Sequence, residues 1–226
     1  MVLVFDLDDT LYEELTFVRS GFRAVADYLN EQYSIPPQSG LEFMLQKLLS
    51  GRGRIFDDLL DYHGIYTKKL VRKCVSVYRF HRPEIALYPE ADACLERFGN
   101  YPQYIVTDGN KVVQNNKIKA LGLDRRVKYC YITHCYGIKN AKPSSYCFLK
   151  ICGRERVSPK EVVYIADNPH KDFVGIKPLG FKTIRVLQGQ YKDLILSKEY
   201  EADRQIYSLR ELNEDLLNQR YERRIP

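Results

Sequence analysis

The chain has 226 residues and a mass of 26.5 kDa, enough for one large domain or for a core domain with a smaller companion. A composition of 45% hydrophobic and 28% charged residues excludes a collagen-like or low-complexity chain and predicts a sizeable core. No apolar run approaches the roughly 18 residues of a membrane-spanning helix, and no secretory signal opens the chain, so we expect a cytoplasmic protein without a membrane partner. The net charge of +6 favours anionic partners without choosing among them.

The first part of the chain predicts one strand followed by several helices. Val2 to Phe5 form a β-branched and aromatic run, which predicts a buried strand that ends at Asp6. The segment that follows repeats apolar residues at intervals of three and four, the spacing of one face of a helix. Interrupted by prolines and glycines, the expected helices occupy about residues 14–34, 41–49, 55–62 and 68–80.

After Pro89 the pattern changes to an alternation of helices and strands. Helices are expected at about 90–98, 111–121, 144–152 and 172–179, and the strands that follow them at about 104–107, 128–133, 162–166 and 182–187. A strand near 205–207 and a helix near 209–217 close the chain. This alternation is typical of an α/β fold in which a parallel sheet carries helices on both faces. The stretch of helices after the first strand then reads as an insertion into that fold.

Two carboxylates follow the first expected strand. In open α/β sheets the ligand lies outside the carboxyl ends of the strands. Asp6 and Asp8 are two residues apart, so in extended chain their side chains point the same way. Neighbouring carboxylates repel each other unless a proton or a cation joins them, and Mg²⁺, which prefers oxygen ligands, would relieve that repulsion. The alternative is a turn and capping cluster without a ligand.

Three further segments place polar groups at strand ends or helix starts. Thr107-Asp108-Gly109 offers a hydroxyl and flexible backbone for a phosphoryl oxygen, or simply a helix cap. Lys142 offers a point charge suited to phosphate or carboxylates, or is a solvent-exposed loop lysine. Asp167 and Asp172 bring two more carboxylates, with helix capping as the alternative for Asp172.

Taken in chain order, these segments resemble the four motifs of the haloacid dehalogenase superfamily: Asp-x-Asp-x-Thr, Thr, Lys-Pro and Asp-x₄-Asp. The resemblance covers nearly the whole chain. It implies a Rossmann-like α/β core of residues 1–13 and 89–226 and a helical-bundle cap of residues 14–88. One departure is Ala166, where the family usually has glycine, and the extra methyl group should be tolerated.

The resemblance also implies a mechanism. Asp6 would attack phosphorus and form an aspartyl-phosphate, and Asp8 would act as general acid and then as general base. Thr107 and nearby backbone N–H groups, with Asp108 and Gly109, would hold the phosphoryl oxygens, and Lys142 would offset their charge. The expected cofactor is Mg²⁺, bound by acidic residues of the first and fourth motifs: Asp6, the backbone carbonyl of Asp8, Asp167 and Asp172.

The reaction class follows from Asp8, because the dehalogenase branch of the superfamily lacks this second acid. We therefore expect a phosphoric monoester hydrolase, a phosphatase acting on a small phosphorylated metabolite such as a sugar phosphate or a nucleotide. A sugar phosphomutase of the same superfamily is the alternative. From another class, a catalytically silent scaffold or a nucleic-acid-binding module stays open, the latter through the basic segments 68–73 and 220–224; a nucleic-acid partner is nevertheless not expected.

Substrate choice is assigned to the cap. Gly51-Arg52-Gly53-Arg54 is the expected specificity loop, because glycines let the backbone move and Arg52 or Arg54 would bind a second anionic group or hydroxyls. The alternative is a plain turn with solvated arginines. The 18 tyrosines would suit a homodimer surface, but the sequence does not locate one.

Overall fold

The computed structural model describes residues 1–218, which form two compact units. The α/β unit contains Met1–Glu14 and the chain from Ala86 onward, and the helical unit contains Leu15–Ile85. Within the described residues, no helix is both long and apolar enough to cross a membrane. The basic segment 220–224 and the last residues of the expected core domain lie outside this range.

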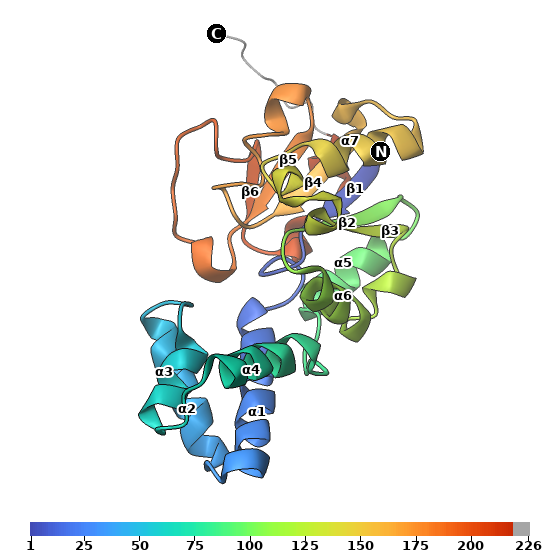
Figure 1. Ribbon diagram of the computed structural model, residues 1–226. Coiled ribbons are helices and arrows are strands. Elements are labelled where there is room, and N and C mark those ends of the chain that lie inside the picture. Colours follow the sequence, from blue (N-terminus) through green and yellow to red (C-terminus); the bar gives the residue numbers. More distant parts are fainter. Residues whose placement is uncertain (219–226) are drawn as a thin grey trace. The chain divides into compact units, whose positions relative to one another are not determined.

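A six-stranded parallel sheet organises the described part of the α/β unit (Figure 1). Its strands, in spatial order, are β3 (Tyr129–Ile132), β2 (Gln103–Thr107), β1 (Val2–Phe5), β4 (Val162–Ala166), β5 (Lys182–Val186) and β6 (Arg204–Ile206). Phe5 of β1 lies opposite Ile105 on one side and Ile165 on the other. The strand order reverses between β1 and β4, and in such sheets this reversal marks the ligand site.

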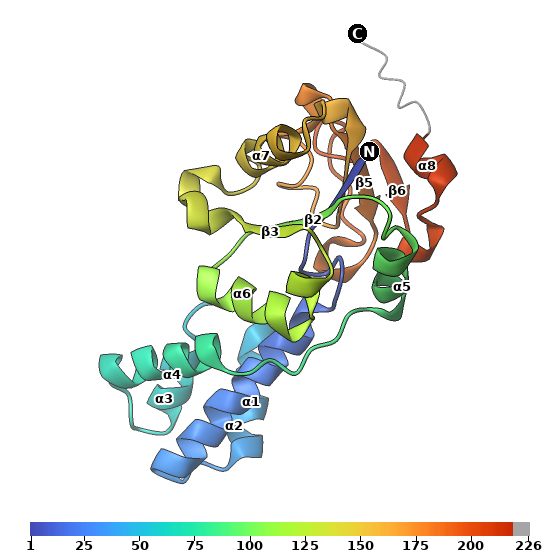
Figure 2. The same ribbon diagram turned by 90° about the vertical axis from the view of Figure 1, so that its right-hand side faces the viewer.

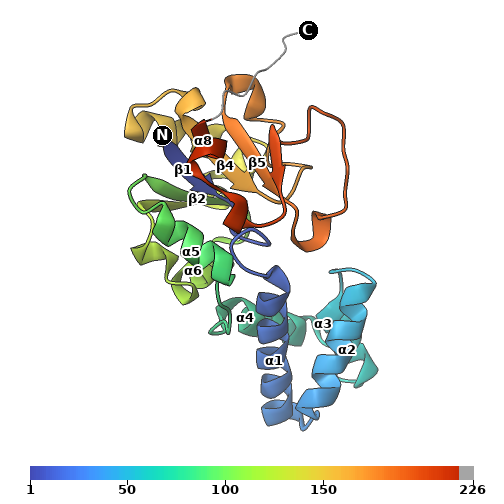
Figure 3. The same cartoon turned by 180° about the vertical axis from the view of Figure 1, so that it is seen from behind.

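Helices cover both faces of the sheet. α7 (Tyr146–Glu155) lies on one face, and α5 (Pro89–Arg97) and α6 (Lys111–Ala120) lie on the other (Figures 2 and 3). Val2 and Val4 pack with Phe148 of α7 in one core cluster, whereas the alternate residues Leu3 and Phe5 are fully buried against the opposite layer. The predicted fold class, a Rossmann-like parallel sheet with helices on both faces and an inserted helical bundle, is confirmed.

The helical unit is a bundle with its own core. Its helices are α1 (Glu14–Tyr33), α2 (Pro37–Leu49), α3 (Ile55–Tyr62) and α4 (Lys68–Phe80). Val18, Phe22 and Val25 of α1 lie on one face and are buried in an apolar cluster that all four helices share. α2 begins earlier than the expected residue 41, because Pro37 fits the first turn of a helix.

Three expected helices of the α/β unit differ from the structure. The segment 172–179 contains only a short 3₁₀ turn, Lys177–Leu179, because Gly175 and Pro178 disfavour a continuous helix, and helix capping by Asp172 is therefore wrong. α7 begins at Tyr146, two residues after the expected start. The expected helix 209–217 is divided into the 3₁₀ turn Leu209–Glu211 and α8 (Glu214–Asn218). The division comes from Asn213, whose side chain accepts a hydrogen bond from the backbone N–H of Leu216 and so starts a new helix.

Candidate active site

Three buried carboxylates meet where the strand order reverses. Asp6 directly follows β1, Asp167 directly follows β4, and the backbone N–H of Asp6 donates to the carbonyl of Ile165 at 2.9 Å. Asp6, Asp167 and Asp172 each offer a carboxylate oxygen, and these atoms lie within 4.8 Å of one another. Thr10 Oγ1 donates to Asp167 Oδ1 at 3.1 Å, which links the first predicted motif to the fourth. The topology thus brings together acids that are some 160 residues apart in the chain.

Lys142 places one ammonium group among these acids. Its Nζ atom lies 2.9 Å from Asp6 Oδ1 and 2.7 Å from Asp172 Oδ1, and it donates to the hydroxyl of Tyr164 at 3.0 Å. The side chain is buried, so the alternative of a solvent-exposed loop lysine is wrong. Asp172 is itself held firmly, because the Tyr164 hydroxyl donates to its Oδ1 and the backbone N–H of Asn168 donates to its Oδ2.

Burial and crowding shape the electrostatics of this cluster. Burial raises the pKa of Asp6 to about 7, and the charge of Asp172 adds to the rise while Lys142 opposes it. The pKa of Asp167 is also raised, by burial and then by the charges of Asp6 and Asp172. For Lys142, burial opposes the shift, but the carboxylates of Asp172 and Asp6 raise its pKa well above the ordinary value. The acids outnumber the ammonium, so the cluster favours an added proton or cation.

A hard divalent cation fits this donor set. Asp6 and Asp167 present carboxylate oxygens to one point, and Mg²⁺ takes such oxygens as ligands. Asp172 is nearby, but its two oxygens already accept hydrogen bonds, so it orders Lys142 and the loop after β4 as much as it offers a ligand. The carboxylate of Asp8 lies outside this group of acids; the sequence assigned only its backbone carbonyl to the metal.

The Asp8 carboxylate is bound instead by side chains that the sequence analysis did not single out. Its Oδ1 accepts from the Tyr12 hydroxyl and from Lys117 Nζ, each at 2.6 Å. Its Oδ2 accepts from Gln114 Nε2 at 2.8 Å. Burial would raise the pKa of Asp8, but the Lys117 charge and these hydrogen bonds outweigh it, so the pKa is lowered. Gln114 and Lys117 lie one turn apart on α6, and their buried polar character is visible only once α6 is packed.

The segment after β2 connects the remaining motifs. Thr107 is buried, and its Oγ1 accepts from Gln114 Nε2 at 2.6 Å. The Asp108 carboxylate accepts from Thr133 Oγ1 at 2.6 Å and from the backbone N–H of Lys142 at 3.1 Å. These bonds fix the loop that carries Lys142. The cap of α6 is neither Thr107 nor Asp108: it is the side chain of Asn110, which accepts from Val112 N at 3.0 Å.

Gly109 has a conformation that few other residues adopt. Its φ is +133°, and a Cβ atom there would lie 3.2 Å from the side chain of Gln114. The tight approach keeps the backbone after β2 close to α6. It also leaves the N-terminus of α6 next to the expected phosphate-binding segment.

Comparison with known proteins identifies the family. Residues 1–180 match the haloacid dehalogenase-like hydrolases. The chain belongs to this family. The matched residues contain all four predicted motifs, and the resemblance inferred from them is confirmed.

Individual relatives of this hydrolase include named phosphatases. It is 31% identical over 221 residues to a glyceraldehyde 3-phosphate phosphatase of Methanocaldococcus jannaschii, covering 93% of this chain and 94% of the relative. A phosphoserine phosphatase of Thermus thermophilus is 27% identical over 183 residues, covering 80% of this chain and 70% of the relative. The crystal structure of the putative HAD-hydrolase YfnB of Bacillus subtilis, bound to magnesium, superposes with a TM-score of 0.65 at 21% identity, covering 96% and 98% of the two chains, and shows the shared fold.

Arg52 and Arg54 belong to the helical unit of the hydrolase. They line a pocket of about 340 Å³ whose walls include Phe22, Phe56 and Val71. Arg54 has a φ of +58° and pairs with Asp58 at 3.7 Å. The pocket therefore combines apolar walls with two arginines and one acid, Asp57.

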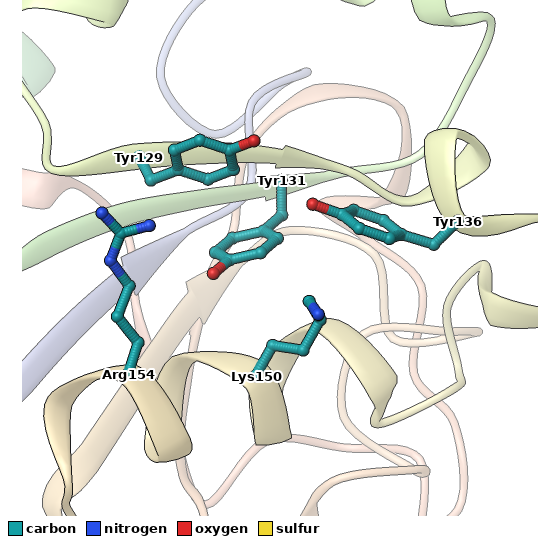
Figure 4. A pocket seen from close by; sticks show the side chains of 5 residues that line it. All are labelled: Tyr129, Tyr131, Tyr136, Lys150 and Arg154. Carbon is teal, nitrogen blue, oxygen red and sulfur yellow. The ribbon is translucent and has the colours of Figure 1, made fainter.

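The α/β unit has a hollow beside β3 and α7. It has a volume of about 470 Å³ and is lined by Tyr129, Tyr131, Tyr136, Lys150 and Arg154 (Figure 4). The Arg154 guanidinium lies 5.3 Å from the centre of the Tyr129 ring, and Lys150 Nζ lies 5.5 Å from that of Tyr136. The lining residues include none of the clustered carboxylates.

Proposed function

We propose that this hydrolase is a Mg²⁺-dependent phosphatase that cleaves phosphate monoesters of small metabolites through an aspartyl-phosphate on Asp6. One observation carries the proposal: the buried Asp6 carboxylate lies 2.9 Å from Lys142 Nζ and shares a 4.8 Å cluster with Asp167 and Asp172. A nucleophilic carboxylate needs a cation beside it, because the carboxylate and the approaching phosphate are both negatively charged and repel each other. The phosphatase names of the relatives support the same reaction.

Mg²⁺ is the proposed cofactor. Asp6 and Asp167 would hold it with the backbone carbonyl of Asp8, and Asp172 would stand beside them. When bound, Mg²⁺ would neutralise the crowded acids and withdraw charge from the phosphoryl group. The raised pKa of Asp6 and of Asp167 supports this assignment, since both groups gain from an added positive charge.

The reaction is assigned to two carboxylates in sequence. A carboxylate oxygen of Asp6 attacks phosphorus, the P–O bond to the leaving group breaks, and Asp8 gives the leaving oxygen a proton. Water then attacks the phosphorus of the aspartyl-phosphate, and Asp8 takes a proton from it. The bond between Asp6 and phosphorus breaks, which releases inorganic phosphate and restores both carboxyl groups.

Phosphate recognition is assigned to the segment after β2 and to Lys142. The Thr107 hydroxyl and the backbone N–H groups of Asp108 and Gly109 would donate to phosphoryl oxygens. Lys142 would contribute charge from its position between Asp6 and Asp172. These donors are in place before any substrate arrives, because the bonds from Thr133 and Lys142 to Asp108 already fix the loops.

Substrate selection is assigned to the helical unit acting as a cap. Arg52 and Arg54 of the helical unit would bind a second anionic or hydroxyl-rich group of the substrate. A three-carbon phosphate ester is the first choice, because the relatives named above act on glyceraldehyde 3-phosphate or phosphoserine. Arg52→Ala and Arg54→Ala should raise the KM for such esters and leave hydrolysis of an aryl phosphate unchanged.

The proposal is tested by phosphate release from 4-nitrophenyl phosphate, glyceraldehyde 3-phosphate and phosphoserine, with Mg²⁺ and with a chelator. Activity should require Mg²⁺ and should vanish in Asp6→Asn, while Asp124→Asn, which changes an exposed acid, should behave as wild type. Full activity of Asp6→Asn would show that Asp6 is not the nucleophile. Transfer of phosphate within a sugar phosphate, without release, would indicate a phosphomutase, and inactivity on all esters would favour a silent scaffold.

A further inference from the structure

The Asp8 carboxylate is held asymmetrically. Oδ1 accepts two hydrogen bonds, from Tyr12 and from Lys117, whereas Oδ2 accepts one, from Gln114. A carboxylate offers about four lone-pair sites, two on each oxygen. These hydrogen bonds therefore fill Oδ1 and leave one site on Oδ2. The Asp8 side chain keeps 24% of its surface exposed, so the carboxylate is not sealed off by its donors.

The donors that hold Asp8 are buried and fixed. The Lys117 side chain is only 4% exposed, and a buried ammonium is tolerated because Asp8 pairs with it at 2.6 Å. Gln114 is equally buried, and its side chain lies so near Gly109 that a Cβ atom there would be only 3.2 Å away. Neither side chain can swing away from Asp8 without leaving a polar group unpaired in the interior.

Gln114 also connects Asp8 to the phosphate-binding segment. Its Nε2 atom donates both to Asp8 Oδ2, at 2.8 Å, and to Thr107 Oγ1, at 2.6 Å. A single amide group therefore sets the position of the acid–base oxygen relative to the hydroxyl assigned to the phosphoryl group. Proton transfer depends on such distances, because the donor must reach the leaving oxygen at hydrogen-bond range.

We propose that Gln114 and Lys117 are positioning residues that hold Asp8 so that its Oδ2 atom carries the catalytic proton. This inference rests on the proposed function. In the first step the Oδ2 proton passes to the ester oxygen as the P–O bond breaks, and the electron pair of that bond stays with the ester oxygen. In the second step Oδ2 accepts a proton from the water that attacks the aspartyl-phosphate. Gln114 and Lys117 themselves exchange no proton.

The leaving group of the substrate makes this role measurable. An alkoxide needs a proton as it departs, whereas 4-nitrophenolate departs readily without one. kcat/KM reports the steps up to the first P–O cleavage, so it isolates this proton transfer. We expect Gln114→Met and Lys117→Met to lower kcat/KM for glycerol phosphate about 10²-fold and for 4-nitrophenyl phosphate less than about 10-fold.

Controls separate positioning from a structural role. Lys119→Met changes an exposed lysine on the same helix and should match wild type on both esters. Asp8→Asn should show the same dependence on leaving group, and adding Gln114→Met to Asp8→Asn should cost nothing further with glycerol phosphate. Thermal unfolding checks that each variant folds. If Lys117→Met does not fold, Gln114→Met, which exchanges one uncharged side chain for another, still tests the positioning role.

The outcomes distinguish this inference from the proposed function. Equal losses on both esters, no loss, or additive losses in the double variant would overturn the positioning role while leaving the phosphatase intact. If wild type hydrolyses neither ester, or Asp6→Asn keeps full activity, the proposed function fails and the positioning role fails with it.

Discussion

The Nζ atom of Lys142 lies 2.7 Å from Oδ1 of Asp172, and neither side chain is more than 1% exposed. Lys142 is on the loop before α7 and Asp172 is on the loop after β4, so the pair joins two loops at the carboxyl edge of the sheet. The same ammonium also serves Asp6 at 2.9 Å. A single buried ammonium group thus offsets the charge of two carboxylates. Its removal should lower both the stability of the fold and the rate of catalysis.

Lys142→Met should abolish hydrolysis and lower the free energy of unfolding by about 3–5 kcal/mol, because it leaves buried carboxylates without a cation. Urea unfolding of the metal-free protein measures the change. Adding Asp172→Asn should recover part of the lost stability, because it removes one of the stranded charges. Lys139→Met, at an exposed position on the same loop, should stay within about 0.5 kcal/mol of wild type. Full stability of Lys142→Met would contradict the buried pairing.

The pKa of Asp6 predicts how stability depends on pH in the absence of metal. Burial, reinforced by the charge of Asp172 and opposed by Lys142, raises this pKa from 3.8 to about 7. Between these values the folded protein keeps a proton that the unfolded chain releases, so the contribution of Asp6 to stability falls as pH rises through that window. Urea unfolding with chelator at several pH values should therefore show the unfolding free energy of wild type falling relative to that of Asp6→Asn from acid to neutral pH. A constant difference would contradict the raised pKa.

The acids of the site could be predicted from the sequence, because a polar residue directly after an apolar run indicates the end of a strand. Asp6 and Asp167 each follow an apolar run, and the alternation of strands with helices places such ends along one edge. The sequence gives no comparable signal for Gln114 and Lys117. Each lies inside a helix among other polar residues and becomes buried only when α6 packs. Tyr164 is similar: its ring belongs to an apolar strand, and only the structure shows its hydroxyl between Lys142 and Asp172.

The expected helix 172–179 shows where local pattern misleads. Phe173 and Ile176 are spaced like the buried face of a helix and are indeed buried. A series of tight turns buries them equally well, and Gly175 within those turns approaches Pro143 too closely for any other residue. Packing around Lys142 therefore decides the backbone here, and a single sequence does not display that packing.

Gly175→Ala should disturb the site, although Gly175 is not one of the residues that form it. A Cβ atom at this position would lie 1.7 Å from the carbonyl oxygen of Pro143, so the segment that carries Lys142 must shift. We expect a loss of about 1–3 kcal/mol in unfolding free energy, as for other overpacked cores, together with a lower kcat. Gly153→Ala is the matched control, since nothing lies within 4 Å and α7 should gain roughly 0.5–1 kcal/mol. Equal behaviour of the two variants would show that the backbone around Pro143 yields freely.

Arg185→Met should loosen the chain after β5 at a point that also touches the site. The buried Arg185 guanidinium donates to the carbonyl of Asp167 at 3.2 Å, to that of Leu194 at 2.9 Å, and to Glu201 at 2.7 Å. Without it Glu201 loses its cation and the loop loses its attachment to β5, so trypsin should cut at Lys192 and Lys198 faster than in wild type, well below the temperature of global unfolding. The Mg²⁺ affinity should fall as well, because the backbone of Asp167 is released. Arg210→Met, an exposed exchange of the same kind, should leave both the cutting rate and the affinity unchanged. If trypsin cuts Arg185→Met at the same rate as wild type, the loop is held by its remaining contacts alone.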